Sequence, residues 1–384
     1  MKILHYISVF SHLSETFIYD LLRHLEYLKE FEQIVVCHKR INEISRPFTP
    51  LVILPYSKNP ISMVYRRFSI RRWSCPIPLE SSNVLERHKP HIIHCHFGVN
   101  AVRMAAHLRQ NIGSIPMVVH CHGTDIISLP HQDKIYRDKL LSLSKYDNVR
   151  FVANTNYLKQ KMIDMGIPKA STRVVNYSVN PSFINSKKRS NFSETTDAFR
   201  VISVGRLIAW KGHTYLIEGL AYFLKRHPQR AKLTLIGDGP ERKKLEKQVK
   251  KLNLVDRVTF EGSLEHHQVA EALQRHDLLI QPSIIDPKTQ QCEAFGMTVI
   301  EAIAVGLPVA VTNSGGMPEL VQRETPWSRI IEPASSSAIS QVLFEFQKKT
   351  WGNRNNRDYA KELLRIYSKE NQTNSIMKIY QEFA

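Results

Sequence analysis

The chain contains little cysteine. Five cysteines occur among its 384 residues, at scattered positions and without a Cys-x-x-Cys pair. An odd number at such spacing argues against a disulfide framework and favours reduced, buried thiols. The five are Cys37, Cys75, Cys95, Cys121 and Cys292.

Long apolar runs are also missing. No segment approaches the roughly 18 apolar residues of a membrane-spanning helix. The opening segment, MKILHYISVF, lacks the longer apolar core and the small-residue cleavage site of a signal peptide. We therefore expect this segment to be a buried first strand and the protein to be cytoplasmic.

Acidic residues are in deficit. The chain has 53 Lys and Arg against 35 Asp and Glu, which gives a formal net charge of +18. Such a balance favours anionic partners, such as nucleic acid, an acidic membrane or phosphorylated small molecules, and charge alone does not choose among them. With 42% hydrophobic and 23% charged residues, the composition is that of a globular protein, and the length predicts two domains.

What the sequence does contain is an alternation of β-rich and amphipathic segments. Strands alternating with helices predict βαβ units and a parallel sheet, and nearly continuous apolar strands suit burial on both faces. In the first half the predicted strands are KILHYISV, QIVVC, LVIL, HIIHC, PMVVH, VRFVA and TRVVN, with helices near 15–29, 98–111, 132–145 and 155–166.

A polar, charged stretch at 185–199 interrupts this pattern, and we interpret it as a linker. The alternation then restarts, which predicts a second parallel α/β domain. We expect an N-terminal domain at 1–184, a C-terminal domain at 200–365 and a final helix at 366–384 that packs back on the N-terminal domain. The predicted strands of the second domain are RVISVG, KLTLIG, RVTFEG, DLLIQPS, LPVAVT and SRIIEP, with helices near 213–227, 240–252, 265–275 and 296–305.

Two of the β-rich runs, HIIHCH and PMVVHCH, end in His-Cys-His. Alternate side chains of a strand share a face, so in each run the histidines point one way and the cysteine the other. Metal ligands must converge, and no pair here has finger-like spacing. We therefore expect no metal site, and we expect His94 and His120 to be buried and hydrogen-bonded.

His96 and His122 end these runs, each beside or one residue from a glycine. Ligands of open α/β sheets bind beyond the carboxyl ends of the strands, and glycine lets the backbone approach a ligand closely. We predict functional roles for both histidines. Asp125 follows His122 within one turn.

The second half carries cations after its first strand. In SVGRLIAWKGH, Arg206 and Lys211 flank a turn before a helix, where two positive charges and helix-start amides suit a diphosphate. A solvated basic loop is the alternative.

In LIGDGPERKKLE, Gly237 stands in a turn that resembles a nucleotide-binding one, but the G-x-G-x-x-G dinucleotide pattern is absent. A plain strand-to-helix turn is the alternative.

Two glutamates, Glu293 and Glu301, flank the segment AFGMTVI. We expect Glu293 in a loop and Glu301 two turns into a helix that starts near Gly296, whose first-turn amides suit an anion. A buried carboxylate at Glu301 needs a partner, which the hydroxyls of a ribose would supply. Exposure on the outer face of the helix is the alternative.

In this order the segments resemble the retaining glycosyltransferases of family four. These have the GT-B fold, in which two Rossmann-like, doubly wound parallel-sheet α/β domains face a cleft. The resemblance covers most of the chain, and the paired glutamates followed by SGGMPELV are its most specific part. The matching segments are SETFI (14–18), HFG (96–98), HGTD (122–125), VGRL (204–207), KG (211–212), GDGPER (237–242), EAFGMTVIEA (293–302), GLPVAV (306–311) and SGGMPELV (314–321).

The resemblance implies a role for each matching residue. His122 would contact the donor sugar or the reacting centre, Asp125 would support it or the acceptor, and Glu293 would hold the sugar hydroxyls; these three form the implied catalytic site. Arg206 and Lys211 would hold the diphosphate, and Glu301 would bind the ribose. The implied donor-binding residues are Arg206, Lys211, Gly237, Glu293, Ala294, Phe295, Gly296, Met297, Thr298 and Glu301. The implied acceptor or cleft residues are Ser14, Glu15, Thr16 and His96.

The resemblance further implies a reaction. A sugar would pass from a nucleotide-diphosphate sugar, linked to UDP or GDP, to a glycan or lipid-linked acceptor in surface-polysaccharide biosynthesis. Configuration would be retained, without a cofactor or divalent metal, because the cations stabilise the leaving group. Nucleic acid would not be a partner. The alternatives are other nucleotide-sugar chemistry, as in an epimerase or phosphorylase, and a basic nucleic-acid-binding protein.

Two departures from the family and one further segment stand out. No glycine follows the first strand, in SVFSHLSETF, and Tyr177-Ser178-Val179-Asn180 replaces the usual Gly-Val-Asp. The segment YRRFSIRRW (65–73) interleaves arginines with aromatic residues. On a helix, such a segment would lie on an anionic bilayer, so we expect peripheral binding to the inner face of the cell membrane; a solvated basic helix is the alternative.

Overall fold

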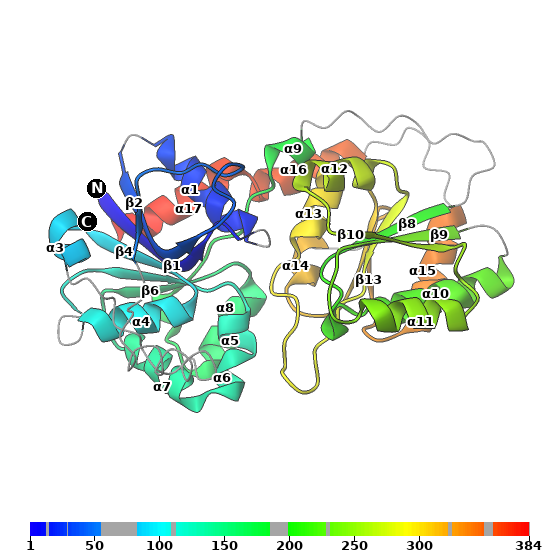
Figure 1. Cartoon of the computed structure of the whole chain (residues 1–384), viewed down its shortest axis with the longest axis horizontal. Coiled ribbons are helices and arrows are strands. Elements are labelled where there is room, and N and C mark those ends of the chain that lie inside the picture. The colour runs from blue at the N-terminus through cyan, green and yellow to red at the C-terminus, as the bar shows by residue number, and fades with distance from the viewer. Residues whose placement is uncertain are drawn as a thin grey trace. The chain divides into compact units, whose positions relative to one another are not determined.

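The chain forms two compact units in the computed structural model (Figure 1). Unit 1 comprises Met1–Ser178 and Lys369–Ala384, and unit 2 comprises Val179–Ser368. The structure describes residues 1–12, 15–28, 30–54, 83–108, 113–184, 199–227, 231–321, 325–348 and 356–383. The membrane segment predicted at 65–73 and Ser14 lie outside these residues, as does the predicted linker apart from Phe199, where the first strand of unit 2 begins.

Unit 1 contains a parallel sheet of seven strands in the order β3-β2-β1-β4-β5-β6-β7. The strands are β1 (Lys2–Phe10), β2 (Glu32–Arg40), β3 (Leu51–Ile53), β4 (Ile92–His96), β5 (Met117–His120), β6 (Val149–Ala153) and β7 (Thr172–Val174). The helices are α1 (Thr16–Glu26), α3 (Asn83–His88), α4 (Gly98–Leu108), α5 (Thr124–Ile127), α6 (Leu129–Gln132), α7 (Lys134–Leu143), α8 (Asn156–Met165), the 3-10 turn η2 (Lys169–Ser171) and α17 (Lys369–Gln381).

Unit 2 contains a parallel sheet of six strands in the order β10-β9-β8-β11-β12-β13. The strands are β8 (Phe199–Val204), β9 (Ala231–Ile236), β10 (Val258–Gly262), β11 (Leu278–Gln281), β12 (Val309–Thr312) and β13 (Ser328–Ile331). The helices are α9 (Pro181–Ile184), η3 (Ala209–Lys211), α10 (His213–Arg226), α11 (Arg242–Lys251), α12 (His266–Gln274), α13 (Met297–Ala304), α14 (Met317–Val321), α15 (Ser336–Lys348) and α16 (Asn356–Ile366).

The predicted α/β class with two parallel sheets is confirmed. Every predicted strand and every helix predicted between strands is present, with ends that differ by a few residues. The short helices α5 and α6 were not predicted, because segments of four residues carry no helical period. Among the described residues, we find no helix with both the length and the apolar character needed to cross a membrane.

Each sheet reverses its winding direction at one place. In unit 1 this place lies between β1 and β4: β2 and β3 follow on the far side of β1, and β5, β6 and β7 follow on the far side of β4. In unit 2 it lies between β8 and β11. Loops that leave a parallel sheet at such a switch point open a place for ligands at the carboxyl edge. The candidate residues should therefore lie after β1, β4 and β5 in unit 1, and after β8, β9 and β11 in unit 2.

Apolar helix faces cover the sheets. In unit 1, α1 and α17 pack with β1, β4 and β5 in one cluster of buried side chains, on the side opposite α4 and α7 (Figure 1). In unit 2, α10, α11 and α15 bury their apolar faces against β8, β9 and β11. Each fully buried Leu or Ile contributes roughly 1.5–3 kcal/mol to folding. This burial fixes the helices against the two sheets.

Ion pairs also connect the end of the last helix, α17, to the unit 1 sheet. Glu382 accepts hydrogen bonds from Arg150 Nε of β6 at 2.6 Å and from Arg173 Nε of β7 at 2.7 Å. Partial burial alone would raise the pKa of Glu382, but the hydrogen bonds from Arg173 and Arg150 outweigh it and lower that pKa. The helix predicted at 366–384 begins at Lys369 and forms part of unit 1.

Candidate functional site

The carboxyl edge of the unit 1 sheet carries a group of histidines. His96 of β4 is the register partner of His120 of β5. The rings of His94 and His96 stack at a centroid distance of 4.5 Å, as strand alternation predicts. His5 of β1, which sequence reasoning missed, is the register partner of His94. Together with His122 after β5, these residues are called the histidine cluster.

Hydrogen bonds hold most of this cluster in place. His94 uses both ring nitrogens: Nδ1 lies 2.6 Å from Tyr380 Oη, and Nε2 lies 3.2 Å from His120 Nδ1. The prediction that His94 is buried and hydrogen-bonded is therefore confirmed. For His120 it is only half right, because its Nε2 has no hydrogen-bond partner among the described residues. Burial lowers the pKa values of His5 and His120 to about 3, so both rings are neutral.

His122 is the partly exposed member of the cluster. The centroid of its ring lies 4.9 Å from that of Phe17 of α1 and 4.6 Å from that of Phe97. Its Nδ1 lies 2.6 Å from Tyr177 Oη. Burial is the main cause that lowers the pKa of His122 well below its ordinary value, and the neighbouring His120 and His96 lower it further. The side chain is therefore a neutral imidazole, and Tyr177 orients it.

Asp125 is buried directly behind His122. Its carboxylate accepts hydrogen bonds from the backbone N–H groups of Gly98 at 2.8 Å, His122 at 3.0 Å and Gly123 at 2.9 Å. Burial raises its pKa, and these three bonds oppose that shift. Asp125 thus ties the turn after β5 to the start of α4, and the geometry makes it a positioning residue for His122.

The predicted acceptor residues are placed at the start of α1. Glu15 is the N-cap residue of α1, and Thr16 is buried in its first turn. The same helix carries Phe17 against the ring of His122. His96 is fully buried in the histidine cluster and does not face solvent. Their predicted roles toward an acceptor stay predictions.

In unit 2, a lysine and a glutamate that are far apart in sequence meet at the carboxyl edge of the sheet. Lys211 Nζ, after β8, forms an ion pair with Glu293 Oε2, after β11, and the two side chains are only 14% and 18% exposed. A Cβ atom placed on Gly205 would lie 3.5 Å from Lys211 Nζ. Arg206, the next residue, is exposed. The structure therefore brings one predicted phosphate cation, Lys211, together with the predicted sugar-binding carboxylate of Glu293, and the role of Arg206 stays a prediction.

Two glycines make this arrangement possible. At Gly237, with φ of 128°, a Cβ would lie 2.0 Å from the carbonyl oxygen of Gly205. At Gly315, with φ of 65°, a Cβ would lie 1.9 Å from the carbonyl oxygen of Glu293. The N–H of Gly316 donates to that same oxygen at 2.8 Å. The Gly-Gly pair of SGGMPELV thus supports the backbone of Glu293, a role that the sequence alone did not reveal.

The segment after Glu293 enters α13. Gly296 is the N-cap residue in a left-handed conformation, so the helix begins at Met297 as predicted and Thr298 lies in its first turn. Ala294 and Phe295 are buried, so only their backbone remains for a ligand at the edge of the sheet. Glu301 is 4% exposed, and its Oε1 lies 3.8 Å from Nε2 of His266. The protein itself thus provides a neighbour for this buried carboxylate, and ribose binding by Glu301 stays a prediction.

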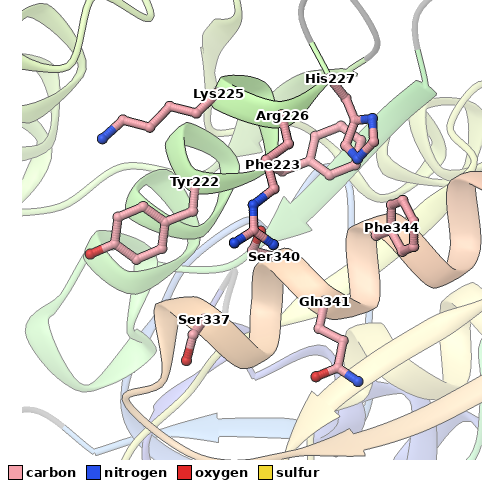
Figure 2. A pocket seen from close by; sticks show the side chains of 9 residues that line it. All are labelled: Tyr222, Phe223, Lys225, Arg226, His227, Ser337, Ser340, Gln341 and Phe344. Atoms are coloured by element: carbon pink, nitrogen blue, oxygen red, sulfur yellow. The ribbon is translucent and has the colours of Figure 1, made fainter.

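A separate cavity of about 720 Å³ lies elsewhere in unit 2 (Figure 2). Its lining comes from the last turns of α10, including Tyr222, Lys225 and Arg226, and from Ser337 to Phe344 of α15. Helix α10 starts beside Lys211 and has 14 residues, which span about 21 Å. The cavity is therefore remote from the Lys211–Glu293 pair and is not part of the candidate site.

Two protein-family models match the chain. The model described as Glycosyltransferase Family 4 matches residues 14–183, and the model described as Glycosyl transferases group 1 matches residues 185–363. Together they cover most of the sequence. The matched ranges contain the histidine cluster residues His94 to His122 and the Lys211–Glu293 pair, respectively.

Several curated proteins are similar to the chain. An uncharacterized glycosyltransferase of Methanocaldococcus jannaschii is 26% identical over 306 residues, which cover 75% of this chain and 74% of the relative. The N-acetyl-alpha-D-glucosaminyl L-malate synthase of Bacillus anthracis is also 26% identical, covering 78% and 76%. The amylovoran biosynthesis glycosyltransferase AmsK of Erwinia amylovora is 28% identical, covering 58% and 55%.

Solved structures share the fold at low identity. The crystal structure of Anabaena HepE in complex with UDP has a TM-score of 0.76 at 19% identity, with 100% of both chains covered. The sucrose-phosphate synthase of Thermosynechococcus elongatus has a TM-score of 0.74 at 17% identity, covering 100% of this chain and 98% of that one.

Proposed function

The chain belongs to the glycosyltransferase family of the group 1 and family 4 models and has the GT-B fold, and from this membership we propose a reaction. The protein moves a sugar from a nucleotide-diphosphate sugar to a glycan or lipid-linked acceptor, with retention of anomeric configuration. Hexosyl transfer in surface-polysaccharide biosynthesis is the proposed setting, supported by the similarity to the amylovoran enzyme and to a putative teichuronic acid biosynthesis glycosyltransferase, TuaC of Bacillus subtilis.

The observation that carries the proposal is the Lys211–Glu293 pair at the carboxyl edge of unit 2. As the bond between sugar and phosphate breaks, negative charge develops on the departing diphosphate. We assign Lys211 and its near neighbour in sequence Arg206 to stabilise that charge, which is the kind of interaction that usually contributes most to catalysis. These cations take the part of a divalent metal, and Glu293 holds sugar hydroxyls beside them.

Unit 1 carries a histidine that suits contact with a sugar. His122 is neutral, held by Tyr177, and kept in position by Asp125 through the backbone. A neutral imidazole with one nitrogen oriented in this way is suited to accept or donate a hydrogen bond to a sugar hydroxyl. We therefore assign His122 to the sugar or the reacting centre, and Asp125 to its support.

UDP is the proposed nucleotide and GDP the alternative. The structurally similar HepE was crystallised with UDP and with UDP-glucose. We expect UDP at about 100 times its Kd to stabilise the protein by roughly 2.7 kcal/mol, which raises the melting temperature of a unit of this size by about 5–10 °C. A thermal-shift screen of UDP, GDP, ADP and CDP measures this effect. Failure of every nucleoside diphosphate to raise the melting temperature would contradict the donor assignment.

A location at the inner face of the cell membrane is proposed from the segment 65–73, which carries Arg66, Arg67, Arg71 and Arg72 among aromatic residues. Basic residues gain about 1 kcal/mol each near an anionic lipid surface. We expect the protein to sediment with liposomes containing phosphatidylglycerol and not with neutral ones. Replacing the four arginines with glutamate should abolish sedimentation, and binding that survives this change would exclude the segment as the contact.

A further inference from the structure

The cavity between α10 and α15 in unit 2 has no part in the proposed transfer reaction (Figure 2). Its volume of about 720 Å³ falls within the range of small-molecule sites, roughly 300–1,000 Å³. The end of α10 lines one side. The other side is one face of α15, where Ser337, Ser340, Gln341 and Phe344 follow one another at helical spacing.

Close packing fixes the two helices against each other next to this cavity. A Cβ atom placed on Gly219 of α10 would lie 2.6 Å from Cγ2 of Ile339 and 2.9 Å from the carbonyl oxygen of Ser336. Ser336 Oγ also donates a hydrogen bond to Glu218 Oε2 at 2.7 Å. The walls of the cavity are therefore two helices in direct contact, and the cavity is already formed without a ligand.

Arg226, the last residue of α10, brings a positive charge to the cavity. Figure 2 shows its guanidinium group pointing from α10 toward α15, and its side chain has no ion pair or hydrogen bond with another described residue. The carboxylates next along the two helices are engaged elsewhere: Glu218 accepts from Tyr222 Oη at 2.9 Å, and Glu345 pairs with Arg329 at 3.2 Å. The planar fork of a free guanidinium fits a phosphate group.

The neighbouring Lys225 does not add to this charge inside the cavity. Its Nζ lies 5.9 Å from the ring centroid of Tyr222, and in Figure 2 its side chain extends away from Arg226. We therefore assign an anion to Arg226 and not to Lys225.

Hydroxyl groups and aromatic rings make up the rest of the lining that we use. Ser337 and Ser340 each offer a hydroxyl that can donate and accept. The ring of His227 lies 5.0 Å from that of Phe223 and 5.0 Å from that of Phe344, so the three rings form one wall. A guanidinium, two hydroxyls and an aromatic wall match the phosphate, the hydroxyls and the C–H faces of a phosphorylated sugar.

We propose that this cavity binds a small phosphorylated sugar, with the phosphate on Arg226 and the sugar hydroxyls on Ser337 and Ser340. It is a second carbohydrate site, remote from the Lys211–Glu293 pair. The lining comes from two helices that are more than a hundred residues apart in the chain, so no sequence motif marks it.

The inference does not depend on the proposed transfer reaction, because its test needs neither donor nor acceptor. The probe is glucose 6-phosphate, and its binding to the full chain is measured by saturation-transfer NMR. We expect a Kd below about 1 mM. Glucose and inorganic phosphate, added as competitors, should displace the probe only at concentrations at least about tenfold higher, because each keeps only part of the contacts.

The Lys211→Met protein separates this cavity from the donor site and should bind glucose 6-phosphate as tightly as the unaltered protein. The absence of saturable binding, or a loss of binding in Lys211→Met, would overturn the proposal. Inorganic phosphate that competes as well as the probe itself would overturn the assignment to a sugar.

Variants of Arg226 locate the site. We expect Arg226→Gln to weaken probe binding by at least about tenfold, and Arg226→Lys to weaken it less, because the charge is kept and only the planar fork is lost. Arg275→Gln is the matched control: Arg275 is also exposed, ends α12 as Arg226 ends α10, and does not line the cavity. Equal affinities of Arg226→Gln and Arg275→Gln would contradict the assignment.

Discussion

We expect the Lys211→Met protein to transfer sugar about 100-fold more slowly than the unaltered protein, or slower still. The lysine ammonium is a mostly buried cation at the carboxyl edge of unit 2, and its loss would leave charge on the departing diphosphate uncompensated. Glu293→Gln should lower transfer by a similar factor, because a carboxylate that holds sugar hydroxyls becomes a weaker acceptor. The measurement is the initial rate of product formation from a radiolabelled nucleotide sugar.

Stability changes separate this effect from damage to the fold. Either single variant leaves one charge of a mostly buried pair without its partner, which costs about 3–5 kcal/mol for a fully buried pair and less at this exposure. The double variant Lys211→Met with Glu293→Gln removes both charges. We expect its melting temperature to recover toward the unaltered value while transfer stays low. Lys225→Met, at the far end of α10, is the control and should leave transfer unchanged.

We expect Gly315→Ala to lower transfer by about 100-fold, because an added Cβ would lie 1.9 Å from the carbonyl oxygen of Glu293. The backbone has to move, the bond from Gly316 N–H to that oxygen is lost, and the Glu293 side chain is displaced. A displacement of about 1 Å is sufficient for a loss of this size. Enzyme assays together with thermal melts measure both consequences.

Gly306 offers a matched control for this substitution. It also has a positive φ, of 79°, but no atom lies within 4 Å of a Cβ placed there. Gly306→Ala therefore costs only the left-handed strain of alanine, about 1–2 kcal/mol, and should retain transfer. If both variants lose transfer equally, or if Gly315→Ala is fully active, then the support of Glu293 by the Gly-Gly turn is wrong.

The strands and the main helices were predictable because local pattern determines them. Apolar runs such as PMVVH and VRFVA are bounded by polar turns, and the intervening segments have helical period. The same reasoning placed Gly296 at the start of α13, since glycine suits the left-handed N-cap found there. It did not find α5 and α6, which are too short for a period.

The partners of the site residues were not predictable, because they come from distant parts of the chain. Tyr380 reaches His94 from the last helix, and His5 joins the cluster through the register of β1 with β4. Tyr177 appeared in the sequence only as a departure from a family motif. Lys211 and Glu293 were each predicted as donor residues, but their pairing follows from strand order, which places β8 beside β11.

The most direct test of the donor site is to measure by calorimetry how tightly UDP binds to the unaltered protein, to Glu293→Gln and to Lys211→Met. The Glu293 carboxylate pairs with Lys211, so we expect it to compete with a phosphate group for the same cation. We therefore expect Glu293→Gln to bind UDP several-fold more tightly than the unaltered protein, and Lys211→Met to bind it at least about tenfold more weakly. If both substitutions leave UDP affinity unchanged, or shift it in the same direction, the Lys211–Glu293 pair is not where the diphosphate binds.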